Sequence, residues 1–309
     1  MQRYILRRLL FGIPTIFGVA VIAFSILHLM PGDPISVMVA GFDGGASAEQ
    51  VAALRASFGL DRPAYVQFFS FVSGAVQGDF GTSIRTGQDV GAMMMRALPH
   101  TLQLAAVALV FATVLGVTLG VIAAVNHRRW ADNTSMFASL VGVSMPEFWF
   151  GILAILLLAV TFPIFPSSGT GGLKYLLLPG IVLGTRAAAA IARLTRSSML
   201  EVLNQQYIVT ARAKGMGKVI IVARHALRNA FIPVITLIGL LLGRLLGGTV
   251  VVETIFNRQG IGKMLIDSII EKDIPTLQAT ILVVAVVYVF LNILVDISYG
   301  WFDPRIRYS

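Results

Sequence analysis

Long apolar runs separated by polar segments dominate the chain. Six of them are near 20 residues or longer, the length that an α-helix needs to cross a bilayer. The predicted spans are residues 9–30, 101–125, 134–162, 174–192, 231–252 and 276–301. The polar segment 31–99 is too long and too mixed to cross, and it contains a predicted short helix at 48–58 and an amphipathic run at 63–76. The pattern therefore predicts six transmembrane helices with a large segment outside the bilayer after the first.

The fold class follows from the solvent around the spans. A bilayer core offers no water to backbone groups, so each span must satisfy its own hydrogen bonds as a helix. We therefore expect an all-α integral membrane protein. Gly116 and Gly120 in the second span, and Gly243 and Gly247 in the fifth, form GxxxG pairs typical of close helix packing. The two halves show no clear repeat, which disfavours a secondary carrier built from inverted repeats.

Composition supports a membrane location. The chain has 309 residues, of which 56% are hydrophobic and 13% charged, whereas soluble domains carry about 25% charged residues. The net charge of +9 could indicate nucleic acid, but the cations mostly flank apolar spans, which is a topology signal. We therefore expect contact with membrane lipid and none with nucleic acid. The absence of cysteine excludes disulfides and thiolate chemistry.

The distribution of charge predicts the orientation. With the N-terminus inside, the inner segments hold fourteen cations and three acids, and the outer segments hold eight cations and ten acids. An excess of Lys and Arg marks cytoplasmic segments. Both termini are therefore predicted to be cytoplasmic, with residues 31–99 outside. The first apolar run is too long for the core of a cleaved signal peptide, so we expect it to be retained.

The most basic polar segment lies between the fourth and fifth spans, at residues 193–233. Glu201 is its only acid, and its cations are Arg193, Arg196, Arg212, Lys214, Lys218, Arg224 and Arg228. Helix-favouring runs flank the break Gly215-Met216-Gly217. Such internal order favours a docking element. The alternative is an ordinary basic loop held near anionic lipid headgroups.

This loop carries a resemblance to a known family. Its run TARAKGMGKVIIVARHALRNAFIPV resembles the cytoplasmic loop of bacterial ATP-binding-cassette import permeases, and more narrowly the first permease subunit of the dipeptide, oligopeptide, glutathione and nickel importers. The stretches LHLMPGDP, FGLDRPAYVQF, QGDFGTSIRT, LGGTVVVETIFNRQGIG and FDPRIRYS agree, so the resemblance covers nearly the whole chain. One departure is that Val209 stands where the general loop pattern has glutamate, six residues before Gly215. Another is Arg228 in place of the pattern's proline.

The resemblance implies a permease subunit that forms half of a path for dipeptides, oligopeptides or glutathione-like peptides across the bacterial inner membrane. It implies as partners a second homologous permease, two ATPase subunits that hold ATP and Mg, and a periplasmic binding protein. This chain has no GxxxxGK[ST] motif, no HExxH and no clustered histidines, so we expect no enzymatic activity, cofactor or metal in it. A nickel chelate or another small solute is an alternative substrate, and an ion-coupled carrier is an alternative mechanism.

The resemblance also implies a coupling helix, around residues 211–217 and within the loop 193–230, that docks on an ATPase. Tyr207, Ile208, Ala211 and Lys214 are spaced to share one helical face. Glycine permits a sharp turn that bulkier residues oppose. The residues expected to couple to the ATPase are Tyr207, Ala211, Arg212, Ala213, Lys214, Gly215, Met216 and Gly217.

Two ionisable residues are predicted to lie deep in the bilayer. Glu147 and Arg244 each fall 13 residues from the inner end of a predicted span, which is roughly 20 Å at ~1.5 Å per residue. Neither should face lipid, so they either pair or face a water-filled translocation path. In the path hypothesis Arg244 meets a peptide carboxylate and Glu147 an amine. The alternative is a mutual salt bridge or a contact with backbone carbonyls. Arg186 is near an inner end and is expected to snorkel.

The segment after the fifth span carries Phe256, Gly260 and Gly262 before the amphipathic run KMLIDSII, which predicts a short helix at the outer mouth. The resemblance implies that these residues and segment 31–99 contact the binding protein or an outer gate. The alternative is a structural plug over the helix ends. The predicted organisation is therefore a first helix at 1–30, a periplasmic segment at 31–99 and a five-helix permease core at 100–309.

Overall fold

The structure is a computed structural model that describes residues 2–29, 47–57 and 61–302. Within these ranges the regular structure is helical, with one isolated β-bridge between Thr82 and Asp89. Most of the motif LHLMPGDP and of the tail FDPRIRYS lies outside the described residues. The longer helices are α1 (Gln2–Leu29), α5 (Val90–Val125), α6 (Trp130–Ser144), α8 (Lys174–Leu203), α11 (Leu227–Ile255) and α13 (Ile274–Phe302). The shorter ones are α3 (Ala48–Ser57), α4 (Ala64–Gln77), α7 (Glu147–Ile155), α9 (Gln206–Ala213), α10 (Lys218–Ile220) and α12 (Ile261–Ile270).

Four helices are long and apolar enough to cross a membrane. They are Val90–Val125, Lys174–Leu203, Lys218–Ile255 and Ile274–Val295, and the bent pair of α6 and α7 would be a fifth candidate if it forms one span. Helix α1 contributes the shorter apolar stretch Leu10–Ser25. The structure therefore confirms an all-helical membrane protein and supplies four or five of the six predicted spans.

The chain divides into two compact units, which we describe separately. Among the described residues, unit 1 contains 101–258 and 291–302, and unit 2 contains 2–29, 47–57, 61–100 and 259–290. The division within α5 falls after His100, next to Pro99. We predicted that a helix would begin only after this proline, but α5 begins at Val90 and continues through it. Asp89 accepts a hydrogen bond from the backbone N–H of Ala92 at 2.7 Å, which stabilises the early start.

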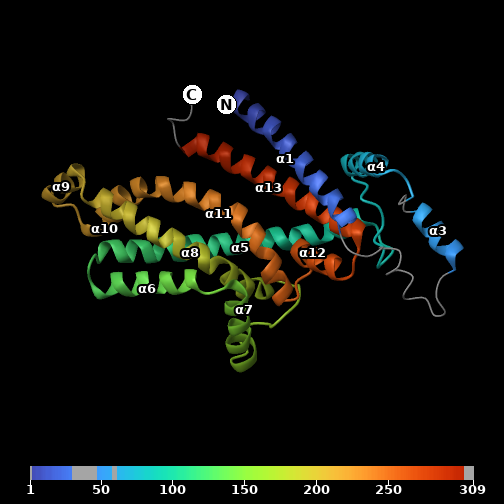
Figure 1. The fold of residues 1–309 in the computed structure, drawn as a ribbon. Helices are drawn as coiled ribbons and strands as arrows, with labels where there is room; N and C mark the ends of the chain where they lie inside the picture. Colours follow the sequence, from blue (N-terminus) through green and yellow to red (C-terminus); the bar gives the residue numbers. More distant parts are fainter. Residues whose placement is uncertain (1, 30–46, 58–60, 303–309) are drawn as a thin grey trace. The chain divides into compact units, whose positions relative to one another are not determined.

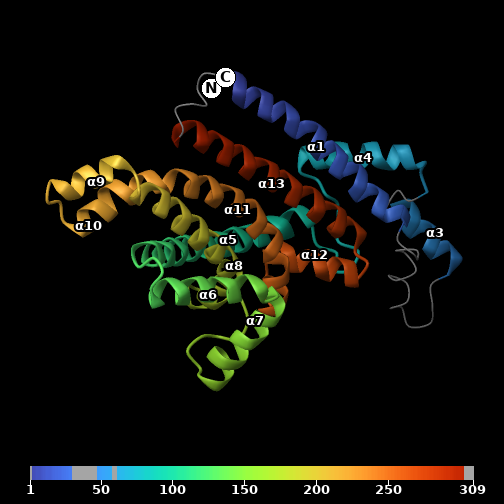
Figure 2. The same cartoon turned by 60° about the vertical axis from the view of Figure 1, so that its left-hand side comes forward.

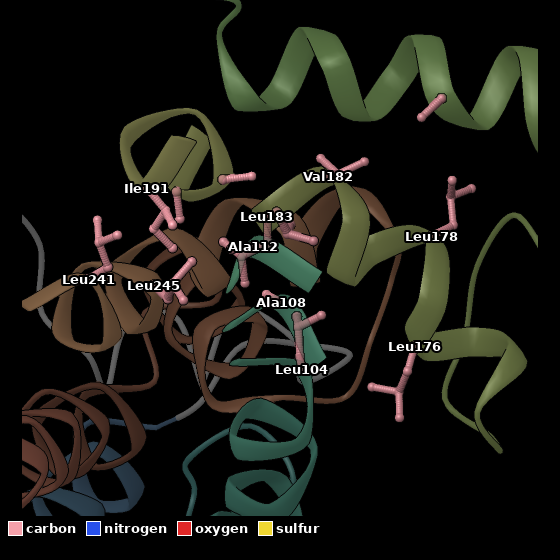
Figure 3. Close-up of a cluster of buried hydrophobic side chains, with 14 of the residues drawn as sticks. Leu104, Ala108, Ala112, Leu176, Leu178, Val182, Leu183, Ile191, Leu241 and Leu245 are labelled. Carbon is pink, nitrogen blue, oxygen red and sulfur yellow. The ribbon is translucent and has the colours of Figure 1, made fainter. Parts of the chain in front are cut away.

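Helix α8 is the centre of unit 1. Of its apolar stretch 67% is buried, against 33% or less in the other three candidate spans. Its side chains pack with those of α5 and α11 in the main apolar cluster, and Figure 3 shows labelled members of this cluster from all three helices. In Figures 1 and 2, α6 and α11 also run beside α8. Helix α8 is therefore a core helix surrounded by protein rather than by lipid.

Glycines allow the close approach of α5 and α8. A Cβ added at Gly116 would lie 2.6 Å from the carbonyl oxygen of Ala188, and one at Gly120 would lie 2.5 Å from Cβ of Thr195. The first predicted GxxxG pair is therefore a packing contact. At Gly247, in the second predicted pair, an added Cβ would meet nothing within 4 Å. For that residue the predicted contact is absent from the described part of the chain.

The predicted third span, residues 134–162, is wrong as a continuous helix. Helices α6 and α7 meet at an angle of 104°. Pro146 has no N–H to continue the ladder of α6, and its ring disfavours the helical conformation at the preceding residue. Met145 accordingly has φ −77° and ψ 129°. After α7 the chain continues as a π-helical stretch, η1 (Leu156–Thr161).

The basic segment is mostly helical. Helix α8 runs to Leu203, so Arg193 and Arg196 belong to it, whereas we predicted that they lie in a loop. Lys218–Ile255 forms a second long helix through α10, the π-helical stretch η2 (Ile221–Ala226) and α11. The non-helical connections around α9 are residues 204–205 and 214–217. The predicted coupling helix at 211–217 is therefore displaced, because α9 ends at Ala213 and Gly215 turns the chain with φ +78°.

Unit 2 confirms the three predicted short helices. Helices α3, α4 and α12 match the predicted 48–58, 63–76 and KMLIDSII segments. The ring of Phe68 on α4 packs edge-on against Phe17 and Phe24 of α1. Asp273, which is 3% exposed, accepts hydrogen bonds from Ser83 Oγ at 2.5 Å and Thr276 Oγ1 at 2.7 Å. The motif QGDFGTSIRT is thereby fixed to the start of α13.

Candidate functional site

A cavity of about 400 Å³ opens between the end of α6, the start of α7, and helices α8 and α11. All of its lining residues belong to unit 1. Six of them are apolar, namely Val143, Leu183, Ala187, Ala190, Leu241 and Leu245. The other four are ionisable, namely Glu147, Arg186, Arg193 and Arg244. The cavity thus combines an apolar wall with three cations and one anion.

The helical register explains why these charges meet. Arg186, Ala190 and Arg193 are at positions i, i+4 and i+7, so they follow one face of α8. Arg244 is placed between Leu241 and Leu245 on the facing side of α11. Among the residues that the structure describes, none of the four charged side chains forms an ion pair within 4.0 Å. The four charges therefore surround the cavity without a direct ion pair among them.

Glu147 is the acidic member of the site and the first residue of α7. The 104° bend places it beside α11, where its Oε2 would lie 3.2 Å from a Cβ added at Gly248. Glycine at 248 therefore leaves room for the carboxylate. Glu147 and Arg244 both line this cavity, and in the described residues the two form no salt bridge with each other.

Sequence reasoning missed two members of the site. It predicts that Arg186 snorkels to the inner surface and that Arg193 lies in a loop. The structure places both on the cavity wall, because α8 continues past the predicted end of the span. Their spacing of seven residues, with Ala190 between them, is the signal that could have shown a common face.

A second charged cluster in unit 1 is fully paired. Arg196 of α8 binds Asp132 of α6 in a bidentate pair, with Nε to Oδ1 at 2.6 Å and Nη2 to Oδ2 at 2.8 Å. The backbone N–H of Arg128 donates to the same carboxylate at 2.9 Å, and His127 Nδ1 lies 3.2 Å from it. The Asp132 side chain is only 3% exposed. This cluster attaches the segment between α5 and α6 to helix α8. No pattern in the sequence indicates that these residues meet.

The predicted coupling residues lie on and after α9. Ile208 and Ala211 are buried against Met216 and Ile221, so this part of the predicted common face turns inward. The hydroxyl of Tyr207 accepts a hydrogen bond from Asn229 Nδ2 at 2.8 Å, which joins α9 to α11. The residues of the predicted set that remain exposed are Tyr207, Arg212, Ala213, Lys214, Gly215 and Gly217.

The predicted outer contacts are all buried. Phe256 is 1% exposed and belongs to the main apolar cluster of unit 1, and Gly260 and Gly262 are buried as well. Next to Phe256, Arg258 donates from Nη1 to the carbonyl oxygen of Tyr175 at 2.8 Å, and the Phe256 carbonyl accepts from Gly169 N at 2.9 Å. Burial lowers the pKa of the Arg258 guanidinium. The Phe256 ring therefore has a packing role within this chain.

Metal chemistry has no visible support in the described part of the chain. Residues 2–29, 47–57 and 61–302 contain no group of three or more His, Cys, Asp or Glu side chains that could hold an ion. Unit 1 therefore contains a charged cavity that α8 and α11 help to line. Helix α9 and the exposed basic residues that follow it lie between these two helices in the chain.

Comparisons with known proteins cover the whole chain. The family model described as "Binding-protein-dependent transport system inner membrane component" matches residues 116–308. The model of the corresponding N-terminal region matches residues 1–105. The glutathione transport system permease protein GsiC of Escherichia coli (strain K12) is 41% identical over 309 residues, with 100% of both chains covered. The dipeptide transport system permease protein DppB of Alkalihalophilus pseudofirmus is 40% identical over 336 residues, again covering 100% of both.

Solved structures with the same fold include transporters of amino acids. A chain of the inward-facing MetNI methionine ABC transporter matches with a TM-score of 0.58 and 22% identity, covering 68% of this chain and 96% of that one. A chain of an amino acid ABC transporter with histidines matches with a TM-score of 0.54 and 13% identity, covering 68% and 94%. These similarities show a shared fold.

Proposed function

Because the chain belongs to the family of binding-protein-dependent transport system inner membrane components, we propose that it forms half of the path by which an ATP-driven importer moves peptides across the inner membrane. The observation that carries this proposal is the sequence identity over the full chain, which is 41% to a glutathione permease and 40% to a dipeptide permease. The substrates are therefore dipeptides, oligopeptides or glutathione-like peptides. The chain is a transport component and not an enzyme.

The membrane arrangement that we propose has six spans with both termini in the cytoplasm. It counts α1, α5, the bent pair of α6 and α7, α8, the helix Lys218–Ile255, and α13. The excess of cations in the inner segments supports this orientation. It leaves α9 in the cytoplasm, while α3, α4 and α12 lie outside.

The cavity is the part of the translocation path that this chain supplies. Charged side chains within a bilayer are costly unless they pair or face water. Glu147 and Arg244 belong to predicted spans and form no ion pair with each other among the described residues. A hydrated path for a zwitterionic peptide gives both charges the environment that they require.

Helix α9 is the coupling element. It connects α8 to the long helix that begins at Lys218, and these two helices carry all three arginines of the cavity. The buried pair Ile208 and Ala211 and the bond between Asn229 and Tyr207 hold α9 to its own chain. Its exposed side then contacts an ATPase, and a displacement of α9 moves the cavity walls. Val209 is 51% exposed, so contact at the position of the usual glutamate is apolar.

The remaining parts of the transporter are separate chains. This sequence has no P-loop, so ATP and Mg bind to two ATPase subunits. A second, homologous permease completes the path, and a binding protein delivers the peptide from outside. Closure of the ATPases around ATP is transmitted through α9 and exposes the cavity alternately to the two sides.

Reconstitution tests the proposed function directly. The chain is co-expressed with the products of neighbouring genes, purified and placed in proteoliposomes with ATP enclosed on the ATPase side. We expect ATP-dependent accumulation of a labelled dipeptide or of glutathione, and none without ATP. Failure to co-purify with any P-loop ATPase, or accumulation that survives ATP depletion, would contradict the proposal.

A matched pair of double variants tests the coupling role of α9. Arg212→Glu with Lys214→Glu reverses two exposed cations of the coupling segment, and we expect the ATPases to be lost during purification. Arg62→Glu with Arg96→Glu reverses two exposed cations elsewhere and should leave the complex intact. Equal ATPase recovery from both variants would assign the docking contact to another surface.

A further inference from the structure

The charge of the cavity specifies the substrate more narrowly than the family does. We propose that the cavity accepts peptides whose carboxylates outnumber their amines. This inference rests on the proposed function, because it names the substrate class of the same path. The evidence for it is the set of side chains that line the cavity, whereas the family is assigned from similarity over the whole chain.

The first argument is the balance of charge. Three arginines face one glutamate, and Arg186 is the cation whose charge acts on Glu147. Arg193 and Arg244 then have no carboxylate opposite them among the cavity's lining residues. A cation in apolar surroundings is stabilised by water or by an anion. A peptide with two carboxylates and one amine carries one net negative charge, which offsets part of the excess positive charge of the lining.

The second argument is the chemistry of the wall. The six uncharged lining side chains are valine, leucine and alanine, which offer no hydrogen bonds. Selection within the cavity therefore depends on its four charged groups. Arginine is suited to this role, because its planar guanidinium binds a carboxylate through two parallel hydrogen bonds.

The third argument is size. Arg186 and Arg193 are seven residues apart on α8, which is roughly 10 Å along a helix that rises ~1.5 Å per residue. An extended peptide spans about 3.3–3.6 Å per residue, so about three residues separate two carboxylates by this distance. The volume of about 400 Å³ falls within the usual range of ligand cavities, roughly 300–1,000 Å³. Short acidic peptides therefore fit the site.

Glu147 receives the amino end of the same peptide. Its carboxylate is the one negative group in the cavity, and Gly248 leaves space beside it. A substrate with two carboxylates and a free amine can place an opposite charge beside Glu147 and beside two of the three arginines. A peptide with an additional lysine side chain would meet the three arginines with repulsion.

Competitive uptake in the assembled transporter tests the inference. The probes are trialanine and the same peptide with glutamate or lysine in the central position. The variants are Arg193→Gln and Arg244→Gln, each with the same binding protein, so that selection by that protein cancels. We expect the uptake ratio of acidic to neutral peptide to fall about tenfold or more in each variant, the usual effect of losing a hydrogen bond to a charged group.

The matched control is Arg129→Gln, which removes an exposed arginine between α5 and α6 outside the cavity. It should keep the ratio of the unaltered transporter. Arg193→Lys keeps the positive charge but cannot form two parallel hydrogen bonds to a carboxylate. It should therefore keep part of the preference for the acidic peptide over the neutral one. The unaltered transporter gives a further check that needs no variant, because added salt should weaken uptake of the acidic probe more than of the neutral one.

The outcomes separate the two proposals. An unchanged acidic-to-neutral ratio in both glutamine variants, with ATP-dependent uptake retained, would overturn the inference and leave the proposed function standing. The same holds if the lysine-containing probe is taken up as well as the acidic one. Absence of ATP-dependent uptake of every probe by the unaltered transporter would remove the proposed function and the inference with it.

Discussion

Two arginines one turn apart on α8 serve opposite purposes. Arg196 is held in a bidentate pair by the buried carboxylate of Asp132. Arg193, three residues earlier, lines the cavity and has no ion-pair partner among the described residues. The same side chain is thus a structural clamp in one place and an unpaired charge in the other. The presence or absence of a partner on a neighbouring helix decides which role it has.

The contrast extends to two faces of α8. One face is closed by α5, where Gly116 and Gly120 bring the backbones into contact. The other carries Arg186 and Arg193 into the cavity. Closed faces contribute to stability through packing and paired charges, and an open charged face is available to a ligand. Substitutions on the two faces should therefore have separable effects on stability and on transport.

The largest difference is expected between Arg196→Ala and Arg193→Ala. Removing Arg196 leaves the Asp132 carboxylate buried without its cation, which typically costs about 3–5 kcal/mol. Removing Arg193 breaks no ion pair in the described structure and should change the free energy of unfolding by less than about 0.5 kcal/mol. The measurement is unfolding of the purified chain in mixed detergent. An equal loss of unfolding free energy in the two variants would contradict the distinction between the paired and the unpaired arginine.

A smaller effect is expected at the closed face. Gly116→Ala places a Cβ 2.6 Å from the carbonyl oxygen of Ala188, a backbone atom that cannot rotate away. Overpacking of this kind costs about 1–3 kcal/mol, part of which the higher helix propensity of alanine offsets. Gly247→Ala is the control, since nothing lies within 4 Å of its added Cβ. The same unfolding assay should show destabilisation for Gly116→Ala alone.

A smaller loss of stability than that of Gly116→Ala is expected at Gly248. Its added Cβ would lie 2.7 Å from Leu183 Cδ1 and 3.2 Å from Glu147 Oε2, and both atoms are ends of side chains that can move. We expect Gly248→Ala to cost less than about 1 kcal/mol, because these side chains can adopt other rotamers. It should nevertheless alter peptide uptake by displacing the Glu147 carboxylate. Unchanged uptake with normal assembly would show that this carboxylate does not contribute to the path.

Much of the architecture is predictable because its causes are local. Apolar length and flanking charge indicate the spans, and amphipathic spacing correctly predicts α3, α4 and α12. The bend between α6 and α7 is missed despite the presence of Pro146, because a proline in a membrane helix can end the helix or only bend it. The end of α8 is missed because charge is taken as the end of the span, whereas a helix can continue into water.

For the site, the sequence predicts that Glu147 and Arg244 lie at a common depth in the bilayer and need water or a partner. The family resemblance, which depends on the order of residues along the chain, is confirmed by the comparisons, and the sidedness that the flanking charges indicate stays a prediction. That Arg186 and Arg193 line the same cavity, whereas Arg196 pairs with Asp132, becomes visible only once the helices are packed. Whether an arginine is paired depends on which helix packs against its face of α8. Residues 64 positions apart meet in the Arg196 cluster, and no local pattern encodes that meeting.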